Sequence, residues 1–86
     1  MNPPPSDVYN RILNDMRTIW GEIAVFMLKK RARDVNADMA NLTKEDLLKI
    51  IDLLRQKTLP ATLGPDGAEA KAKQYRSWLD GGSPAQ

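Results

Sequence analysis

A single stretch, residues 7 to 33, constrains the fold of this chain more than any other part of its sequence. Its large apolar side chains recur at intervals of three and four residues, which places them on one face of an α-helix. These side chains are Tyr9, Ile12, Leu13, Met16, Ile19, Trp20, Ile23, Ala24 and Met27. The spacing predicts a long amphipathic helix over 7–33, and we expect the rest of the chain to pack against it.

This helix is too apolar to be covered from one side. Residues 23 to 28 are all apolar, so Val25 and Leu28 point away from the main face. A chain of 86 residues without cysteine has a small core and no disulfide. Association of two copies of the chain, which buries apolar surface between them, is the remaining source of stability. Gly21 lies on the same side and fits a close helix crossing, although a glycine without a role is an equal alternative. We therefore predict a homodimer with an oligomer interface at Gly21, Val25, Leu28, Leu48 and Leu53.

A second helix is predicted over 44–57. Thr43 and Asp46 have the spacing of a capping box, in which each side chain bonds the backbone amide of the other residue. The apolar residues that follow at helical spacing are Leu47, Ile50, Ile51 and Leu54, whereas Leu48 and Leu53 lie off this stripe. Such a helix should be buried on more than one side.

The last third of the chain predicts a loop and a third helix. Two prolines and two glycines punctuate residues 58–67, which is typical of an extended loop with a turn. A helix over 67–80 follows, ended by two glycines. We expect residues 1–5, with three prolines, to be a flexible arm, residues 6–80 to form a single helical domain, and residues 81–86 to be a disordered tail.

The expected fold is therefore all-α, with three helices at about 7–33, 44–57 and 67–80. The connection between the first two helices is short enough to make them an antiparallel hairpin. The C-terminal helix packs across this hairpin. In the predicted dimer, two hairpins complete a four-helix-like core.

The pieces from Leu42 to Leu79 resemble in outline the small helix–extended loop–helix modules that bind DNA or chromatin. The features that carry this resemblance are a leucine-rich first helix, Leu59-Pro60 at its exit, Gly64-Pro65 in the loop, and a short helix with Lys73, Tyr75 and Leu79. The resemblance covers less than half of the chain, and it implies a function in association with nucleic acid.

Two basic clusters are the most conspicuous polar features. Such side chains can neutralise phosphates, which makes them candidates for nucleic-acid binding. The alternative for residues 29–33 is that cations at a helix C-terminus complement the helix dipole. In the third helix, Tyr75 and Trp78 could meet a nucleic acid or simply dock the helix. The candidate nucleic-acid-binding residues are Lys29, Lys30, Arg31, Arg33, Lys71, Lys73 and Arg76.

The chain has few of the side chains that commonly carry catalysis. It has no histidine or cysteine, and no glycine-rich phosphate loop follows a strand pattern. We expect a non-enzyme with no catalytic residues, no metal and no cofactor. No apolar run approaches the roughly 18 residues that cross a bilayer, and the N-terminus lacks the pattern of a secretory leader. A cytoplasmic protein without membrane contact is therefore expected.

Two functions remain open at this point. The first is a small nucleic-acid-binding or transcription-associated protein that acts as a dimer through its basic helix ends. The alternative is a protein–protein interaction module, an adaptor or assembly subunit, that uses its apolar helix surface.

Overall fold

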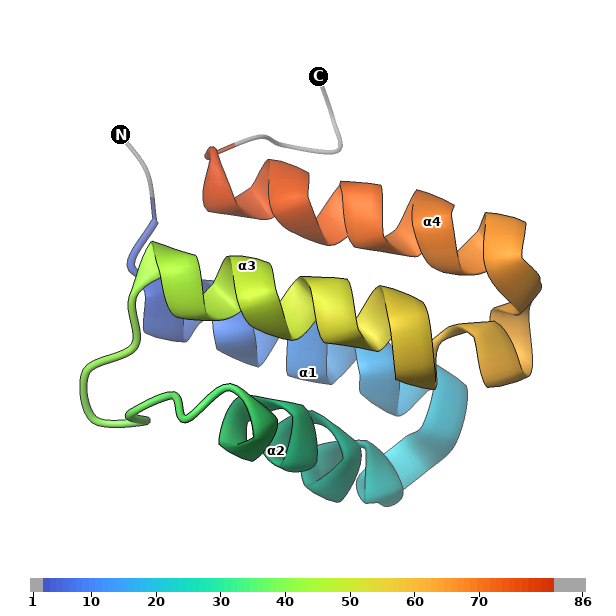
Figure 1. Ribbon diagram of the computed structural model, residues 1–86, viewed down its shortest axis with the longest axis horizontal. Coiled ribbons are helices and arrows are strands. Elements are labelled where there is room, and N and C mark those ends of the chain that lie inside the picture. The colour runs from blue at the N-terminus through green and yellow to red at the C-terminus, as the bar shows by residue number, and fades with distance from the viewer. Residues whose placement is uncertain (1–2, 82–86) are drawn as a thin grey trace.

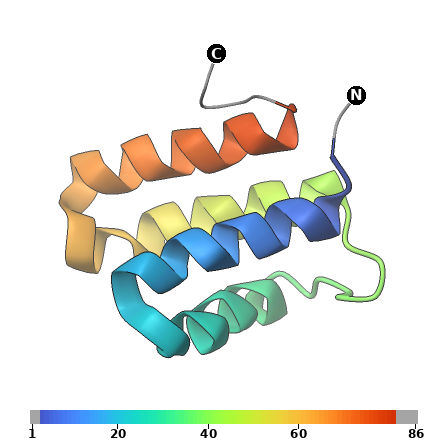
Figure 2. The same ribbon diagram turned by 180° about the vertical axis from the view of Figure 1, so that it is seen from behind.

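The computed structural model describes residues 3–81 and confirms an all-α fold for them. Successive helices run in opposite directions, with α1 and α3 lying between α2 and α4 (Figure 1, Figure 2). Within the described chain, the backbones of α2 and α4 do not approach each other closely. The elements are α1 (Pro5–Trp20), a 3₁₀ turn η1 (Gly21–Ile23), α2 (Ala24–Asp34), α3 (Lys44–Leu53), a π-helical segment η2 (Leu54–Thr58) and α4 (Pro60–Leu79). The start of the predicted arm, 1–2, and most of the predicted tail, 82–86, lie outside the described residues.

Gly21 ends α1 and reverses the chain, so the prediction of one continuous helix over 7–33 is wrong. Its φ of 71° and ψ of −148° lie in a backbone region that is open almost only to glycine. η1 completes the turn, and α2 runs back along α1 (Figure 1). Beyond its chain neighbours, no heavy atom of the described residues lies within 4 Å of a Cβ placed on Gly21. The glycine is therefore required by the turn and not by a close helix crossing.

This reversal closes a core within one chain. Leu28 has no exposed surface and Val25 is half-buried, because α3 and α1 cover the sides of α2 that the sequence leaves apolar. A second copy is therefore not needed to cover Leu28, contrary to the expectation from the sequence, and Leu28 is not available to an oligomer interface. The helices contribute core residues that include Val8, Ile12 and Met16 from α1, Ala24, Leu28 and Ala32 from α2, Leu47, Ile50 and Ile51 from α3, and Ala68, Ala72 and Tyr75 from α4.

The start of α3 confirms the predicted capping box. The backbone N–H of Asp46 donates to Oγ1 of Thr43 at 3.1 Å, and the N–H of Thr43 donates to the Asp46 carboxylate at 3.2 Å. The predicted apolar stripe of this helix is buried as well. Because α1 and α2 are separate helices, the antiparallel hairpin is formed by α2 and α3, with residues 35–43 as its connection (Figure 1).

Residues 58–67, predicted as an extended loop, are mostly helical. η2 continues α3 as a π turn, in which the N–H of Leu59 donates to the carbonyl of Leu54 at 2.7 Å. Pro60 then begins α4, a position where the missing N–H of proline costs nothing. Gly64, with φ 74° and ψ 172°, interrupts the helix with a kink. In residues 3–81 there is thus no extended loop to match the modules that the sequence resembles.

Two aromatic side chains dock α4 on α1. Tyr75 and Trp78 are buried, with ring centroids 5.2 Å apart, and the guanidinium of Arg11 lies 4.2 Å from the centroid of the Trp78 ring. The hydroxyl of Tyr75 donates to Oδ2 of Asp15 at 2.6 Å, and Nζ of Lys71 lies 3.1 Å from the same oxygen. These contacts identify the aromatic residues of α4 as structural anchors, one of the two roles that the sequence allows.

Candidate interaction surface on α2

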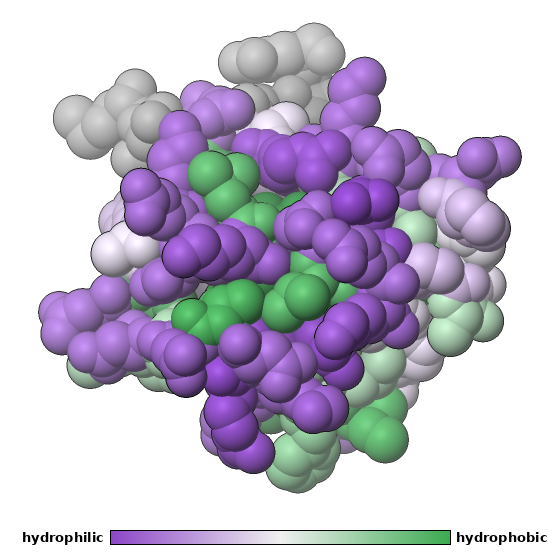
Figure 3. Space-filling view, in the orientation of Figure 1, coloured by the Kyte–Doolittle hydropathy of each residue, from purple (hydrophilic) through white to green (hydrophobic). Residues whose placement is uncertain are grey.

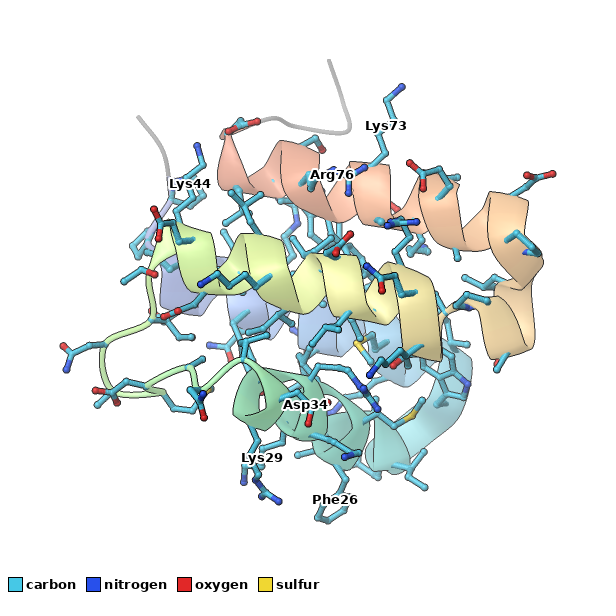
Figure 4. The ribbon with its side chains drawn as sticks, in the orientation of Figure 1. Phe26, Lys29, Asp34, Lys44, Lys73 and Arg76 are labelled. Carbon is cyan, nitrogen blue, oxygen red and sulfur yellow. The ribbon has the colours of Figure 1, made fainter. Side chains whose placement is uncertain are left out.

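Two large apolar side chains lie exposed where α1 turns into α2. Ile23 is 58 % exposed and Phe26 is 70 % exposed. Phe26 points away from the rest of the molecule at the outer edge of α2 (Figure 4). Single exposed apolar residues are common on protein surfaces, but these two are three residues apart and so occupy one helix face.

Cations surround Phe26 on the same face. Lys29, Lys30 and Arg33 follow it at i+3, i+4 and i+7, which are the neighbouring positions on a helix surface. Nζ of Lys30 lies 3.7 Å from Asp34, whereas no acid of residues 3–81 lies within ion-pair distance of Lys29 or Arg33. We call Ile23, Phe26, Lys29, Lys30 and Arg33 the α2 outer face. It combines exposed apolar surface with positive charge.

A shallow hollow extends the α2 outer face on one flank. It has a volume of about 280 Å³ and is lined by Lys29, Ala32, Arg33, Ala37 and Met39. Met39 is itself 43 % exposed, and no acidic residue lines the hollow. The hollow therefore repeats the combination of apolar and basic side chains that surrounds Phe26.

The structure does not bring together the seven cations predicted to bind nucleic acid. Residues 29–33 lie on α2, and the other three lie on α4 in the opposite layer (Figure 1). Lys71 is held by Asp15, and Nη2 of Arg76 lies 3.6 Å from Glu69. Lys73 points away from the body of the molecule (Figure 4). Two of the three predicted α4 cations, Lys71 and Arg76, are thus engaged in ion pairs within the chain.

The predicted interface residues do not form one patch either. Gly21 is exposed at its turn, Val25 is half-buried and Leu28 is buried. Leu48 and Leu53 lie on opposite flanks of α3, because five residues turn a helix by about 140°. On the face drawn in Figure 3, hydrophobic side chains form small patches separated by hydrophilic ones. An interface built from these five residues would therefore not be continuous.

Sequence reasoning missed the exposed apolar members of the α2 outer face. Ile23 fits the buried stripe of a continuous helix, and only the reversal at Gly21 moves it to the surface. Phe26 stands inside the apolar run 23–28, and the run itself does not show which member faces outward. Met39 follows α2 in the connection 35–43. The signal that could have found the turn is Gly21 in the middle of an apolar pattern.

Within residues 3–81, no helix combines the length and apolarity needed to cross a bilayer, and no three potential metal-ligating side chains cluster together. Burial is the larger cause that raises the pKa of Tyr75 above its ordinary value, and the hydrogen bond to Asp15 is the next. Burial also raises the pKa of Tyr9. These shifts belong to the core and not to the α2 outer face.

The chain matches no known protein family, and comparison with curated proteins and with solved structures finds no similar protein.

Proposed function

We propose that the protein is a non-enzymatic interaction module that binds an acidic segment of a partner protein through the α2 outer face. The observation that carries this proposal is Phe26, 70 % exposed and set among cations. Covering a phenylalanine side chain is worth about 1.5–3 kcal/mol, which gives a partner a strong anchor. The cations around it favour a partner segment in which acidic residues flank apolar ones.

A peptide selection tests this proposal with defined ligands. A display library of peptides is selected on the purified chain. Its peptides have about 15 residues, a length that lets one peptide cover a helix-sized surface. We expect enriched peptides to combine acidic residues with large apolar residues at i and i+3 or i+4. Phe26→Asp should weaken their binding at least about tenfold, as for an interface anchor.

Leu48→Asp is the matched control, because Leu48 is also a partly exposed apolar residue, 39 % exposed, but lies on α3. This variant should bind the selected peptides as tightly as the unaltered chain. Equal losses in both variants, or a library without enriched acidic peptides, would contradict the proposal. Circular dichroism must show both variants folded for the comparison to hold.

Nucleic acid is the second candidate partner, and the same aromatic residue supports it. An exposed aromatic ring among lysines and arginines can stack a base of a single strand while the cations meet its phosphates. Titration with random duplex and single-stranded DNA at increasing salt tests this candidate. It predicts an affinity that falls steeply with salt and a loss of binding in the Lys29/Lys30/Arg31 triple alanine variant. Absence of binding at low salt would remove it.

The homodimer expected from the sequence stays a proposal, with a changed interface. Because Leu28 is buried within the chain, the interface we now propose for two copies is formed by Ile23 and Phe26, the most exposed large apolar side chains of the described residues. A twofold contact there would also bring Lys29 and Arg33 of both copies together, and like charges oppose such an association. Sedimentation equilibrium of the chain and of Phe26→Asp tests it: a dimer that survives the substitution excludes this face as its interface.

A further inference from the structure

A second hollow lies on the other flank of α2, where this helix meets η2 and the start of α4. It has a volume of about 240 Å³ and is lined by Met27, Lys30, Arg31, Lys57, Thr58 and Ala61, which we call the α2–η2 hollow. Its walls come from α2 and from the consecutive segments η2 and α4, which are distant from α2 in sequence. No acidic residue is among those that line it.

The π turn of η2 shapes one side of this hollow. A π turn widens the helix by one residue, and such turns occur frequently at functional sites. Here the turn buries Thr58, 7 % exposed and the one buried polar residue found in the described chain, while Lys57 next to it remains exposed. The residues that line the hollow thus include a buried polar side chain and, next to it in the chain, an exposed cation.

Positive charge converges on the α2–η2 hollow. Three cations line it, and Asp34 is the acid that pairs with two of them, at 3.7 Å from Lys30 and 2.9 Å from Arg31. Three positive charges and one negative charge leave a net charge of +2. No acid of residues 3–81 lies within ion-pair distance of Lys57. A dianion would balance this charge.

One residue that lines the hollow also has a donor without an acceptor. The side chain of Arg31 is only 14 % exposed, and its Nη1 donates to Asp34 at 2.9 Å. Its Nε, however, is buried without a hydrogen-bond partner. Buried donors are normally satisfied, and an arginine offers adjacent donors in a geometry that matches the oxygens of a phosphate.

We propose that the α2–η2 hollow binds the phosphate group of a phosphate monoester or free phosphate. Lys30 and Lys57 supply charge, and Arg31 donates its unpartnered Nε–H to a phosphate oxygen. Met27 and Ala61 leave an apolar wall for the organic part of a monoester. The inference does not rest on the interaction function proposed above, because only Lys30 belongs to both surfaces.

Titration with inorganic phosphate, followed by ¹H–¹⁵N NMR, tests the site directly. The Nε–H of Arg31 and the backbone amides of Lys57 and Thr58 should shift together and saturate. Sodium chloride at the same ionic strength should not reproduce these shifts, because it screens charge without filling the site. O-phosphoserine distinguishes the two sources: tighter binding than phosphate identifies a monoester as the ligand, and equal or weaker binding identifies free phosphate.

Two variants and a matched control complete the test. Lys57→Ala removes an exposed cation, so the fold should persist while the Kd for phosphate rises about tenfold. Arg31→Lys keeps the charge beside Asp34 but loses the planar fork, and should also weaken binding. Lys73→Ala removes an exposed cation on α4 and should leave the Kd unchanged. An Arg31 Nε–H that does not respond, or equal weakening by Lys57→Ala and Lys73→Ala, would overturn the proposal.

Discussion

Replacing Tyr75 with phenylalanine removes one oxygen atom from the middle of the α1–α4 contact. That oxygen donates to Asp15 at 2.6 Å, and Tyr75 has no exposed surface. A hydrogen bond to a charged group contributes about 1.5–3 kcal/mol. In the variant, Asp15 keeps its ion pair with Lys71 at 3.1 Å, and its side chain is 23 % exposed. We therefore expect the free energy of unfolding to fall by about 1.5 kcal/mol, the low end of this range. The midpoint of thermal unfolding should fall by about 6–12 °C.

The same variant should also change how stability depends on alkaline pH. Burial, and then the bond to Asp15, raises the pKa of Tyr75 above 10.0 in the folded chain. Above pH 10 the unfolded chain therefore releases the Tyr75 proton while the folded chain retains it. The unfolded state then binds fewer protons, so the free energy of unfolding falls by up to about 1.4 kcal/mol per pH unit. Tyr75→Phe lacks this group, and its stability should fall less steeply with pH.

Urea denaturation followed by circular dichroism at pH 7, 10 and 11 measures both effects. Tyr9→Phe is the control at pH 7, because the Tyr9 hydroxyl forms no hydrogen bond within residues 3–81, and this change should cost less than about 0.5 kcal/mol. The reasoning is refuted if Tyr75→Phe is as stable as the unaltered chain at pH 7. It is also refuted if the two chains lose stability in parallel above pH 10.

Three further predictions concern the core, the turns and the caps. Leu28→Ala should destabilise the chain by about 2–5 kcal/mol and Phe26→Ala by less than about 0.5 kcal/mol, both independently of protein concentration in urea denaturation; a concentration-dependent loss for Leu28→Ala would return it to an interface. Gly21→Ala and Gly64→Ala should each cost about 1–3 kcal/mol, because their backbone conformations suit glycine alone; a neutral effect in thermal unfolding would show that the turn relaxes. Thr43→Ala should cost about 1 kcal/mol by loss of its cap, whereas Thr43→Ser should retain most of it in the same assay.

The parts of the fold that sequence predicts well are those that depend on neighbouring residues. α3 is the clearest case, because Thr43 and Asp46 fix its start locally and the stripe that includes Leu47 and Ile50 follows at one spacing. Gly21 shows the limit. Ile19 and Ile23 keep a helical interval across the turn, so the apolar pattern does not reveal that the backbone leaves the helix between them.

Which side chains are exposed, and which of them meet at one site, depends on contacts between segments that are distant in sequence. The spacing of neighbouring residues carries no information about these contacts. The basic run 29–33 is visible in the sequence, but its surroundings are not. Phe26 beside it is exposed because the reversed α2 buries Leu28 instead. Lys57 and Arg31 line one hollow because η2 packs on α2. No periodicity of the sequence predicts that meeting.

The alternating directions of the four helices place both ends of the described chain on the same side of the molecule, opposite the turn at Gly21 (Figure 1, Figure 2). Dyes attached near residues 3 and 81 would therefore both lie on this side of the folded chain. The folded chain has a radius of gyration of 11.9 Å, and an unfolded chain of this length expands to about 28 Å. Energy transfer between the two ends would consequently report opening of the bundle, and no probe would be needed on the surfaces where ligands are expected.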